Sequence, residues 1–341
     1  MATAAELSLA KKTAPSAARD LFASDSRIFS VGVGWGGNRP VWRVIRNITK
    51  PRGSAQCLEE VGGFQVSYAD VRAEPAFRAN VAYSDPPGTS ANAQPRRTLL
   101  CGVELQNYDY DDRQRKKSNG APMQIRLGTL GCFVRLNDGD ELALLSNAHV
   151  LCPHGDGNSG DLIYNCGCKT PTRFNEVASY RPVHNGLPVT WPGAQEPVDG
   201  SPAWNEADAA LATLCDNIDH CQQLPTPRGL RTLKGCAEAM PGDKVYKCGQ
   251  RTGYTEGVID ATDVFFKMAA PTANHWYWFR GGITITPEPG FPKFDDVGDS
   301  GAVAVRQSDD MAIGLNFAGG SGFTFANDMA TVLKHLNCRL A

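Results

Sequence analysis

Three side chains, a serine, a histidine and an aspartate, stand in sequence contexts that suit nucleophilic chemistry. Ser300 lies within Gly298-Asp299-Ser300-Gly301, directly before the apolar run Ala302–Val305. A serine hydroxyl is a weak nucleophile, so it needs a neighbouring base and hydrogen-bond donors for the oxyanion that develops. Glycine on either side lets the backbone turn so that the amides of Gly298 and Ser300 point at one spot. The motif predicts a nucleophile, although four residues alone also fit a plain turn.

His149 and Asp208 each stand at the end of an apolar run. His149 follows Leu142–Ala148 and opens a Gly- and Pro-rich stretch, and it is the only one of the six histidines that follows such a run. Asp208 begins an apolar run that ends at Leu214, which would set its carboxylate at the rim of a sheet, where it can accept the second imidazole N–H. Asp199 competes with Asp208 for this role, but no apolar strand follows it. Each residue alone also fits a structural role.

The order of the three residues along the chain narrows the mechanism. Histidine, aspartate and serine follow one another as in chymotrypsin-class enzymes, whereas subtilisins run Asp, His, Ser and α/β-hydrolases run Ser, Asp, His. The order predicts acyl transfer, in which Ser300 attacks a carbonyl, His149 takes its proton and Asp208 orients the imidazole. The amides of Gly298 and Ser300 would hold the oxyanion.

The elements around these residues predict a mainly β protein from Leu127 almost to the C-terminus. Gly131–Leu136 and Glu141–Ser146 flank an Asp-Gly turn and predict a hairpin. Many short strands without interleaved helices argue for a barrel or a sandwich. At the end, Asn327 can cap a helix with one apolar face. The other expected strands are Ala209–Leu214, Lys244–Cys248, Gly257–Asp260, Val264–Met268, Trp276–Phe279, Ile283–Thr286, Ala302–Arg306 and Ala312–Phe317.

The N-terminal segment reads as a separate small α/β module. Ala4–Ala23 favours a helix that Pro15 interrupts, and three strand-like runs follow, namely Ile28–Gly34, Val41–Ile48 and Gly63–Val71. The stretch 72–97 is rich in Pro, Ser and Asn, which is typical of a linker. The sequence therefore predicts an α/β domain at 1–75, a linker at 76–98 and a second domain at 99–341. The polar stretch 108–119 is expected to be a solvated loop.

From Gly128 to the C-terminus the chain resembles the trypsin-like peptidases, and in particular the intracellular group that includes plant Narrow Leaf 1 and its bacterial relatives. The matching segments are Gly128–Gly131, Leu145–His149, Asp208–Ala210, Lys247–Gly257, Gly298–Gly301, Gly314–Gly319 and Ala326–Asn327. The N-terminal run Val31–Gly34 also resembles the small α/β domain that such proteins carry. The resemblance implies a chymotrypsin-like double β-barrel, hydrolysis of protein or peptide substrates by a Ser-His-Asp triad, and no metal or organic cofactor.

The resemblance also implies which residues contact the substrate. Phe294, six residues before the nucleophile, corresponds to the floor of the specificity pocket and favours small or medium apolar side chains. Asp295 beside it would reverse that preference towards Arg and Lys if its carboxylate pointed inward. The segment formed by Asn316, Phe317, Ala318 and Gly319 is expected to pair with the substrate backbone as an added strand.

Asp299, next to the nucleophile, bears on how the enzyme would become active. In secreted trypsin-like zymogens the aspartate at this place pairs with an α-amino group that a cut sets free. The present N-terminus lacks the unbroken apolar core of a signal peptide, which predicts a cytoplasmic protein without an export step. We therefore expect the uncut chain to be active, with backbone amides or an Arg as partners of Asp299.

Composition excludes several other classes. The chain has 34 basic and 36 acidic side chains, without the basic excess expected of a nucleic-acid binder, and no apolar run long enough to span a membrane. Its 11 cysteines are expected to be free, mostly buried thiols, such as Cys132 and Cys248.

Two other functions stay open at this stage. One is a protease fold that has lost catalysis and acts as a scaffold or binding module. The other is a zinc-stabilised adaptor, because Cys152, His154, Cys166 and Cys168 share one loop, although their spacing is tighter than the usual zinc pattern. We expect no metal. The sequence leaves the oligomeric state open, a homo-oligomer included.

Overall fold

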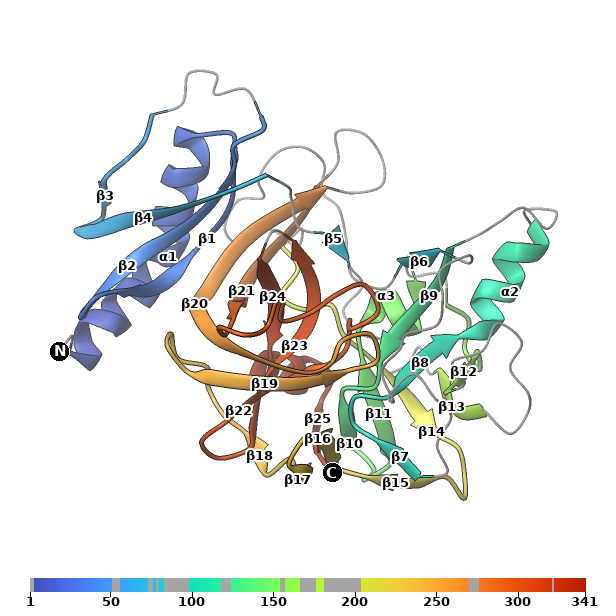
Figure 1. The fold of residues 1–341 in the computed structure, drawn as a ribbon. Helices are drawn as coiled ribbons and strands as arrows, with labels where there is room; N and C mark the ends of the chain where they lie inside the picture. Colours follow the sequence, from blue (N-terminus) through green and yellow to red (C-terminus); the bar gives the residue numbers. More distant parts are fainter. Residues whose placement is uncertain are drawn as a thin grey trace.

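The C-terminal half of the chain forms a closed barrel of six antiparallel strands (Figure 1). The strands are β19 (Lys244–Gly249), β20 (Gly253–Ala269), β21 (Trp276–Pro287), β22 (Val303–Arg306), β23 (Met311–Gly320) and β24 (Phe323–Asp328). They pair in the order β19-β22-β23-β24-β21-β20, and β19 also pairs with β20, which closes the ring. This computed structural model describes residues 3–50, 56–72, 76–77, 80–82, 98–117, 124–153, 157–165, 176–180, 204–269, 276–320 and 322–341.

Two of these strands are longer than the sequence predicts. The runs expected as four short strands form only β20 and β21, and the pairing between the two shifts register near Ile259, Ala261 and Val264. A β-bulge inserts an extra residue and changes which face the next side chains point to. The apolar alternation therefore breaks there, although the strand itself continues.

A second sheet forms the other barrel and contains the predicted hairpin. Cys132 pairs with Leu145 and Arg135 with Leu142, as the Asp-Gly turn indicated. The strand order is β25-β10-β11-β14-β13-β12-β8-β9-β6, and β9 leads directly into β10 along the chain. The bounds are β6 (Asn80–Ala82), β8 (Glu104–Asn107), β9 (Gln124–Thr129), β10 (Cys132–Leu136), β11 (Leu142–Ser146), β12 (Leu162–Tyr164), β13 (Glu176–Tyr180), β14 (Ala210–Leu214) and β25 (Cys338–Leu340).

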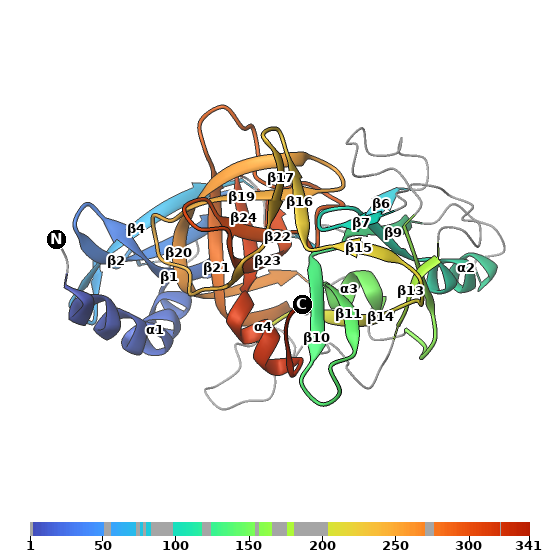
Figure 2. The same cartoon turned by 90° about the horizontal axis from the view of Figure 1, so that it is seen from below.

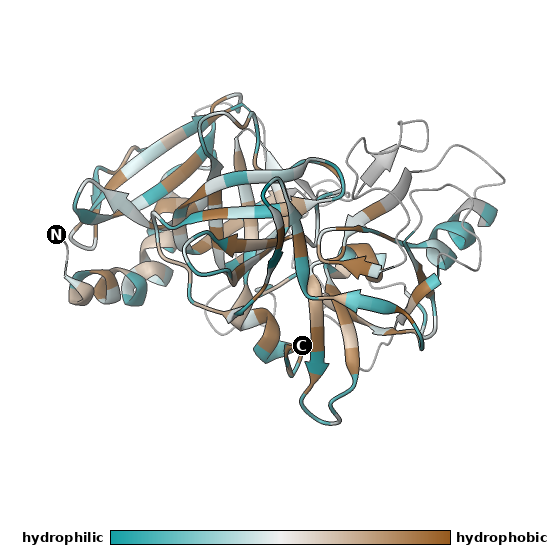
Figure 3. Ribbon diagram, turned by 60° about the horizontal axis from the view of Figure 1, so that its bottom comes forward, coloured by the Kyte–Doolittle hydropathy of each residue, from teal (hydrophilic) through white to brown (hydrophobic). Residues whose placement is uncertain are grey.

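One apolar core joins the two barrels. Phe133 and Leu145 from the first barrel share a cluster with Tyr246, Val303 and Leu315 from the second, and all five are at most 1% exposed. Apolar residues, brown in Figure 3, run along the strands of both barrels. The chymotrypsin-like double β-barrel predicted from the sequence is the observed fold. Its two halves are docked by burial of apolar surface.

The expected small α/β unit precedes the barrels. Helix α1 (Ala4–Ser24) lies on a sheet of β1 (Ile28–Gly36), β2 (Arg39–Asn47), β3 (Glu60–Val61) and β4 (Phe64–Val71). The expected interruption at Pro15 is wrong, because the helix continues through it. A capping box between Thr3 and Glu6 and a buried face that includes Ala18 and Leu21 offset the cost of the proline, about 3 kcal/mol.

This unit shares its sheet with the second barrel. Val31 of β1 pairs with Phe265 of β20, so that the barrel sheet extends through β1 and β2 to β4 (Figure 1). The division at 1–75, 76–98 and 99–341 stays a prediction, because most of residues 76–98 lie outside the described residues.

Two local predictions are wrong. The expected polar loop at 108–119 begins with helix α2 (Tyr108–Lys117), which Asn107 caps through its Oδ1 and which Arg113 ties to Asp161. The final helix, α4 (Met329–His335), is capped by Asp328 and not by Asn327, since the Asp328 carboxylate accepts the Thr331 N–H. Figure 2 shows α4 and the C-terminus beside β10.

The remaining described elements are short. They are α3 (Ala148–Leu151), β5 (Ala76–Phe77), β7 (Thr98–Leu100), β15 (Asp219–Cys221), β16 (Gln223–Thr226), β17 (Gly229–Thr232) and β18 (Gly235–Cys236). No helix in the described part of the chain is long and apolar enough to cross a membrane. The nine cysteines that the structure describes are free thiols, and Cys132 and Cys248 are fully buried, as predicted.

Candidate active site

The structure brings His149, Asp208 and Ser300 together at the junction of the two barrels. His149 Nε2 lies 3.0 Å from Ser300 Oγ, and His149 Nδ1 contacts the Asp208 carboxylate. The Asp208 and Ser300 residues are fully buried, and the His149 side chain is 12% exposed. With the proton on Nδ1 donated to Asp208, Nε2 can accept a hydrogen bond from the Ser300 hydroxyl. The three groups form one hydrogen-bonded path from carboxylate to hydroxyl.

Strand pairing in the first barrel sets the histidine and the aspartate side by side. β11 and β14 pair with Ser146 opposite Ala210, so that His149, just after β11, and Asp208, just before β14, leave the sheet at the same edge. Two further bonds fix the pair, since Asn147 Nδ2 donates to the Asp208 carbonyl at 2.7 Å and the His149 N–H donates to the Asp208 carboxylate at 3.1 Å. The local fold therefore aligns the base with its partner.

Asn327 holds Asp208 from the second barrel. Its Oδ1 accepts the Asp208 N–H at 2.9 Å, and its Nδ2 donates to the carbonyls of Asp208 at 3.2 Å and Leu315 at 3.1 Å. The sequence indicates Asn327 as a helix cap and as part of a matching segment, and predicts no contact with Asp208. An asparagine at the end of a strand carries no signal of a partner that lies 119 residues away.

The turn before Ser300 has the conformation that the glycine motif predicts. Gly298 has a φ of +107°, and a Cβ at this position would lie 2.0 Å from Gln250 Nε2. Thr129 of the first barrel clamps the turn, because its Oγ1 donates to the Gly298 carbonyl at 2.9 Å and its N–H to the Ser300 carbonyl at 2.7 Å. Within the described residues, neither the Gly298 nor the Ser300 N–H has a hydrogen-bond acceptor. Both amides are available to a ligand oxygen.

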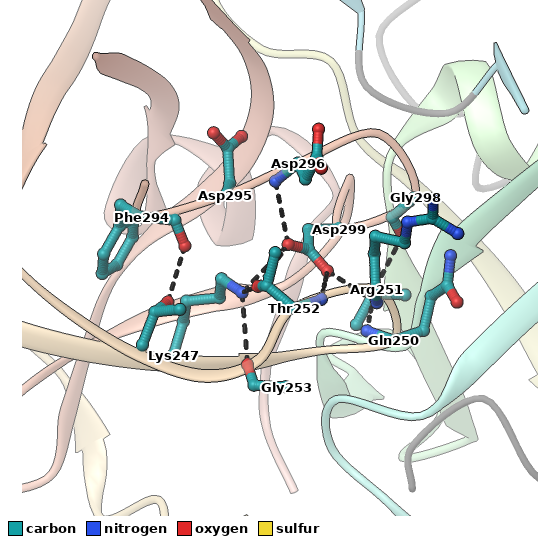
Figure 4. Close-up of polar contacts among 12 residues, drawn as sticks. Lys247, Gln250, Arg251, Thr252, Gly253, Phe294, Asp295, Asp296, Gly298 and Asp299 are labelled. Atoms are coloured by element: carbon teal, nitrogen blue, oxygen red, sulfur yellow. Dashed lines mark hydrogen bonds and ion pairs between the residues drawn. The ribbon is translucent and has the colours of Figure 1, made fainter. Parts of the chain in front are cut away.

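Asp299, between these two amides, has a fully buried carboxylate that five donors hold (Figure 4). Oδ1 accepts the N–H groups of Arg251 at 2.9 Å and Thr252 at 3.2 Å. Oδ2 accepts Lys247 Nζ at 3.0 Å, Thr252 Oγ1 at 2.7 Å and the Asp296 N–H at 2.9 Å. Backbone amides are present, as expected, but the paired cation is a lysine, which the sequence did not single out.

The two residues expected at the specificity pocket have different surroundings. The Phe294 ring is 1% exposed and belongs to the apolar interior of the closed barrel, with Val245 and Ile285. The Asp295 carboxylate is buried and accepts the Thr324 hydroxyl at 2.7 Å. Both residues border a cavity of about 200 Å³ beside the turn that ends at Thr324. Their roles in specificity stay predictions.

The segment expected to bind the substrate backbone belongs to β23. Ser300 Oγ lies 3.4 Å from the Phe317 carbonyl, and Asn316 is fully buried. One step further along β23, Ala318 and Gly319 are paired with the short antiparallel strand β5 (Ala76–Phe77) of the same chain (Figure 1). The edge expected to receive a substrate strand already carries a strand.

Of the suggested zinc ligands only Cys152 is described, and two of the described thiols have pKa values above the usual range. His154, Cys166 and Cys168 of the suggested zinc loop lie outside the described residues. The described residues contain no group of three His, Cys, Asp or Glu side chains arranged for a metal. Burial raises the pKa of the Cys248 thiol to about 12 and that of Cys236 to about 11, so that both stay protonated at neutral pH.

Comparisons with known proteins add a likeness in fold. No protein-family model and no curated protein matches the chain. Among solved structures, the chain is similar to the Nocardiopsis protease NAPase, with a TM-score of 0.44 and 16% identity over 71% of this chain and 98% of that one. It is also similar to Thermobifida fusca protease A, with a TM-score of 0.41 and 16% identity over 63% of this chain and 91% of that one. For Cellulomonas bogoriensis chymotrypsin the TM-score is 0.41 and the identity 18%, over 62% of this chain and 90% of that one. This chain is similar to them in architecture, and its chemistry follows from its own site.

Proposed function

We propose that the protein is a serine endopeptidase that uses Ser300, His149 and Asp208. The observation that carries the proposal is the contact of 3.0 Å between His149 Nε2 and Ser300 Oγ, with the Asp208 carboxylate on the far side of the imidazole. The Gly298 and Ser300 amides, which have no acceptor among the described residues, lie at the same turn. A nucleophile, a base, an orienting carboxylate and two oxyanion donors are the set that acyl transfer requires.

The reaction runs through an acyl-enzyme. Ser300 Oγ attacks the scissile carbonyl carbon while His149 Nε2 takes the hydroxyl proton, and the carbonyl oxygen becomes an oxyanion bound by the two amides. The C–N bond breaks as His149 protonates the leaving amine, which leaves an ester on Ser300. Water then attacks the ester, again giving its proton to His149. Collapse releases the carboxylic product and returns the proton to Ser300.

The substrate in this proposal is an extended polypeptide. Its backbone adds as a strand to β23 at Asn316–Gly319, displacing β5 from Ala318 and Gly319, and main-chain hydrogen bonds give affinity. The side chain before the scissile bond is small or medium and apolar, because Asp295, the group that could favour a basic side chain, is buried and binds the Thr324 hydroxyl through Oδ1. We also assign the chain to the intracellular group that includes Narrow Leaf 1, with a cytoplasmic location. The Lys247–Gly257 motif, which wraps Asp299, supports that assignment.

The test is replacement of the nucleophile in the full-length chain. Ser300→Ala should lower kcat for peptide hydrolysis by about 10⁴- to 10⁶-fold, because triad members act as a unit. Ser308→Ala, in the exposed turn after β22, is the matched control and should leave kcat unchanged. A fluorophosphonate should label Ser300 and spare the thiols. Activity that survives Ser300→Ala but is lost with a thiol reagent overturns the proposal.

A further inference from the structure

The Lys247–Gly257 motif makes contacts with Asp299 that the triad does not explain. It forms the end of β19, a tight turn and the start of β20, and its donors converge on the Asp299 carboxylate (Figure 4). The Lys247 ammonium, the Thr252 hydroxyl and the amides of Arg251 and Thr252 all point at this group. Asp299 in turn connects Gly298 to Ser300. The motif therefore acts on the segment that carries the two oxyanion donors.

The Lys247–Asp299 pair is fully buried and fully hydrogen-bonded. Both side chains are 0% exposed. Besides Asp299, the ammonium contacts Thr252 Oγ1 and the Gly253 carbonyl, the latter at 3.2 Å, so that each of its three N–H groups has an acceptor. A buried ion that loses its partner costs several kcal/mol. The ion pair and the hydrogen bonds to both carboxylate oxygens therefore hold Asp299 in this orientation.

The space around the carboxylate is equally restricted. A Cβ added to Gly249 would lie 2.2 Å from Asp299 Oδ1 and 3.0 Å from Lys247 Nζ. On the other side of the turn, Thr129 binds the carbonyls of Gly298 and Ser300. The second barrel thus holds the side chain of Asp299, and the first barrel holds the backbone of Gly298 and Ser300.

We propose that Lys247 is a positioning residue, whose ammonium holds Asp299 and thereby sets the Gly298 and Ser300 amides for the oxyanion. This inference rests on the proposed peptidase function. β19 carries the lysine as part of the folded barrel, so the cation that faces Asp299 is already present in the uncut chain. The oxyanion site consequently forms when the barrel folds, and cleavage of the chain is not needed to create it.

The experiment compares Lys247→Met with Lys244→Met in the full-length chain. Lys244 lies on the same strand, is 67% exposed at its side chain and pairs with Glu288, so it is a matched control. Lys247→Met should lower kcat by about 10²- to 10³-fold, as loss of an oxyanion donor does, with KM within about threefold. A merely structural lysine would not separate kcat from KM in this way. Lys244→Met should leave both constants unchanged.

A second comparison uses the partner charge. Asp299→Asn in the Lys247→Met background removes the stranded carboxylate, so the double variant should regain part of the kcat that Lys247→Met loses. If Lys247→Met does not fold, Thr252→Val removes one bond to Oδ2 and one acceptor of the Lys247 ammonium, and keeps the ion pair. It should lower kcat by about tenfold with KM unchanged.

The outcomes separate this inference from the proposed function. No hydrolysis and no fluorophosphonate labelling by the wild-type chain overturns the peptidase assignment itself. Wild-type hydrolysis together with unchanged kcat in Lys247→Met, or in Thr252→Val where the first does not fold, overturns the role of Lys247 alone. Activity of the wild type that appears only after a cut between Asn107 and Gly128, detected by mass spectrometry, also overturns it. Activity of the intact mass with the expected loss of kcat supports it.

Discussion

Replacing Asn327 by alanine should weaken both the active site and the fold around it. The side chain is buried, and its loss leaves the Asp208 N–H without an acceptor and the Leu315 carbonyl without this donor, while Asn147 still binds the Asp208 carbonyl. The buried Asp208 N–H left unsatisfied costs about 1–3 kcal/mol, so the free energy of unfolding should fall by about 1–3 kcal/mol. A shift of Asp208 by a fraction of an ångström should lower kcat/KM by about 10- to 100-fold.

The neighbouring residue supplies the control. Asp328→Ala removes the cap of α4, which binds the N–H and hydroxyl of Thr331, and should cost about 1 kcal/mol of stability with kcat/KM unchanged. Urea unfolding and peptide hydrolysis, both measured where each variant is folded, give the two quantities. Unchanged kcat/KM in Asn327→Ala would mean that the hydrogen bonds of Asn327 support only the fold. An equal loss of kcat/KM in Asp328→Ala would show that the effect comes from α4 and not from Asp208.

Three further outcomes follow from individual contacts. Peptide-library profiling should return small or medium apolar residues before the cleaved bond, and Asp295→Asn should leave that preference unchanged; mainly Arg and Lys would contradict it. Because β5 (Ala76–Phe77) lies on the β23 edge, proline at both of its positions should lower KM by about 3- to 30-fold with kcat unchanged, and an unchanged KM would contradict this. Burial alone would raise the pKa of Asp161, but the hydrogen bonds from Arg113 and the Asn158 N–H outweigh it, so the pKa lies below the usual 3.8. Its contribution to stability is therefore complete above pH 3.8 and lost as pH falls through the lower folded value, so that Arg113→Met should reduce acid destabilisation in urea titrations at pH 5 to 2.

The sequence predicted what short segments determine. Ser300 stands in a motif that needs glycine at a positive φ, and His149 and Asp208 each stand at the end of an apolar strand. The hairpin at β10 and β11 follows from alternation and a turn signal, both of which are local. The order of His149, Asp208 and Ser300 along the chain predicted that they act together, and the structure places His149 Nε2 3.0 Å from Ser300 Oγ.

Predictions failed where local patterns mislead. The bulges in β20 shift the alternation, so one strand reads as two. At the C-terminus, Asn327 and Asp328 are both acceptable caps, and only the tertiary partner of Asn327 decides between them. The polar stretch that forms α2 has no apolar periodicity, and its helix depends on anchoring by Asn107 and by the pair of Arg113 with Asp161.

The contacts that complete the site cross between the barrels in both directions. Thr129 of the first barrel holds the turn of Ser300 in the second, and Asn327 of the second barrel holds Asp208 in the first. Each barrel therefore fixes the functional group that the other one carries. Because the apolar core that docks them is continuous, a small displacement of one barrel would loosen the turn at Gly298 and Ser300 together with Asp208. The geometry of the site is consequently a property of the docked pair, which no stretch of sequence from one barrel encodes.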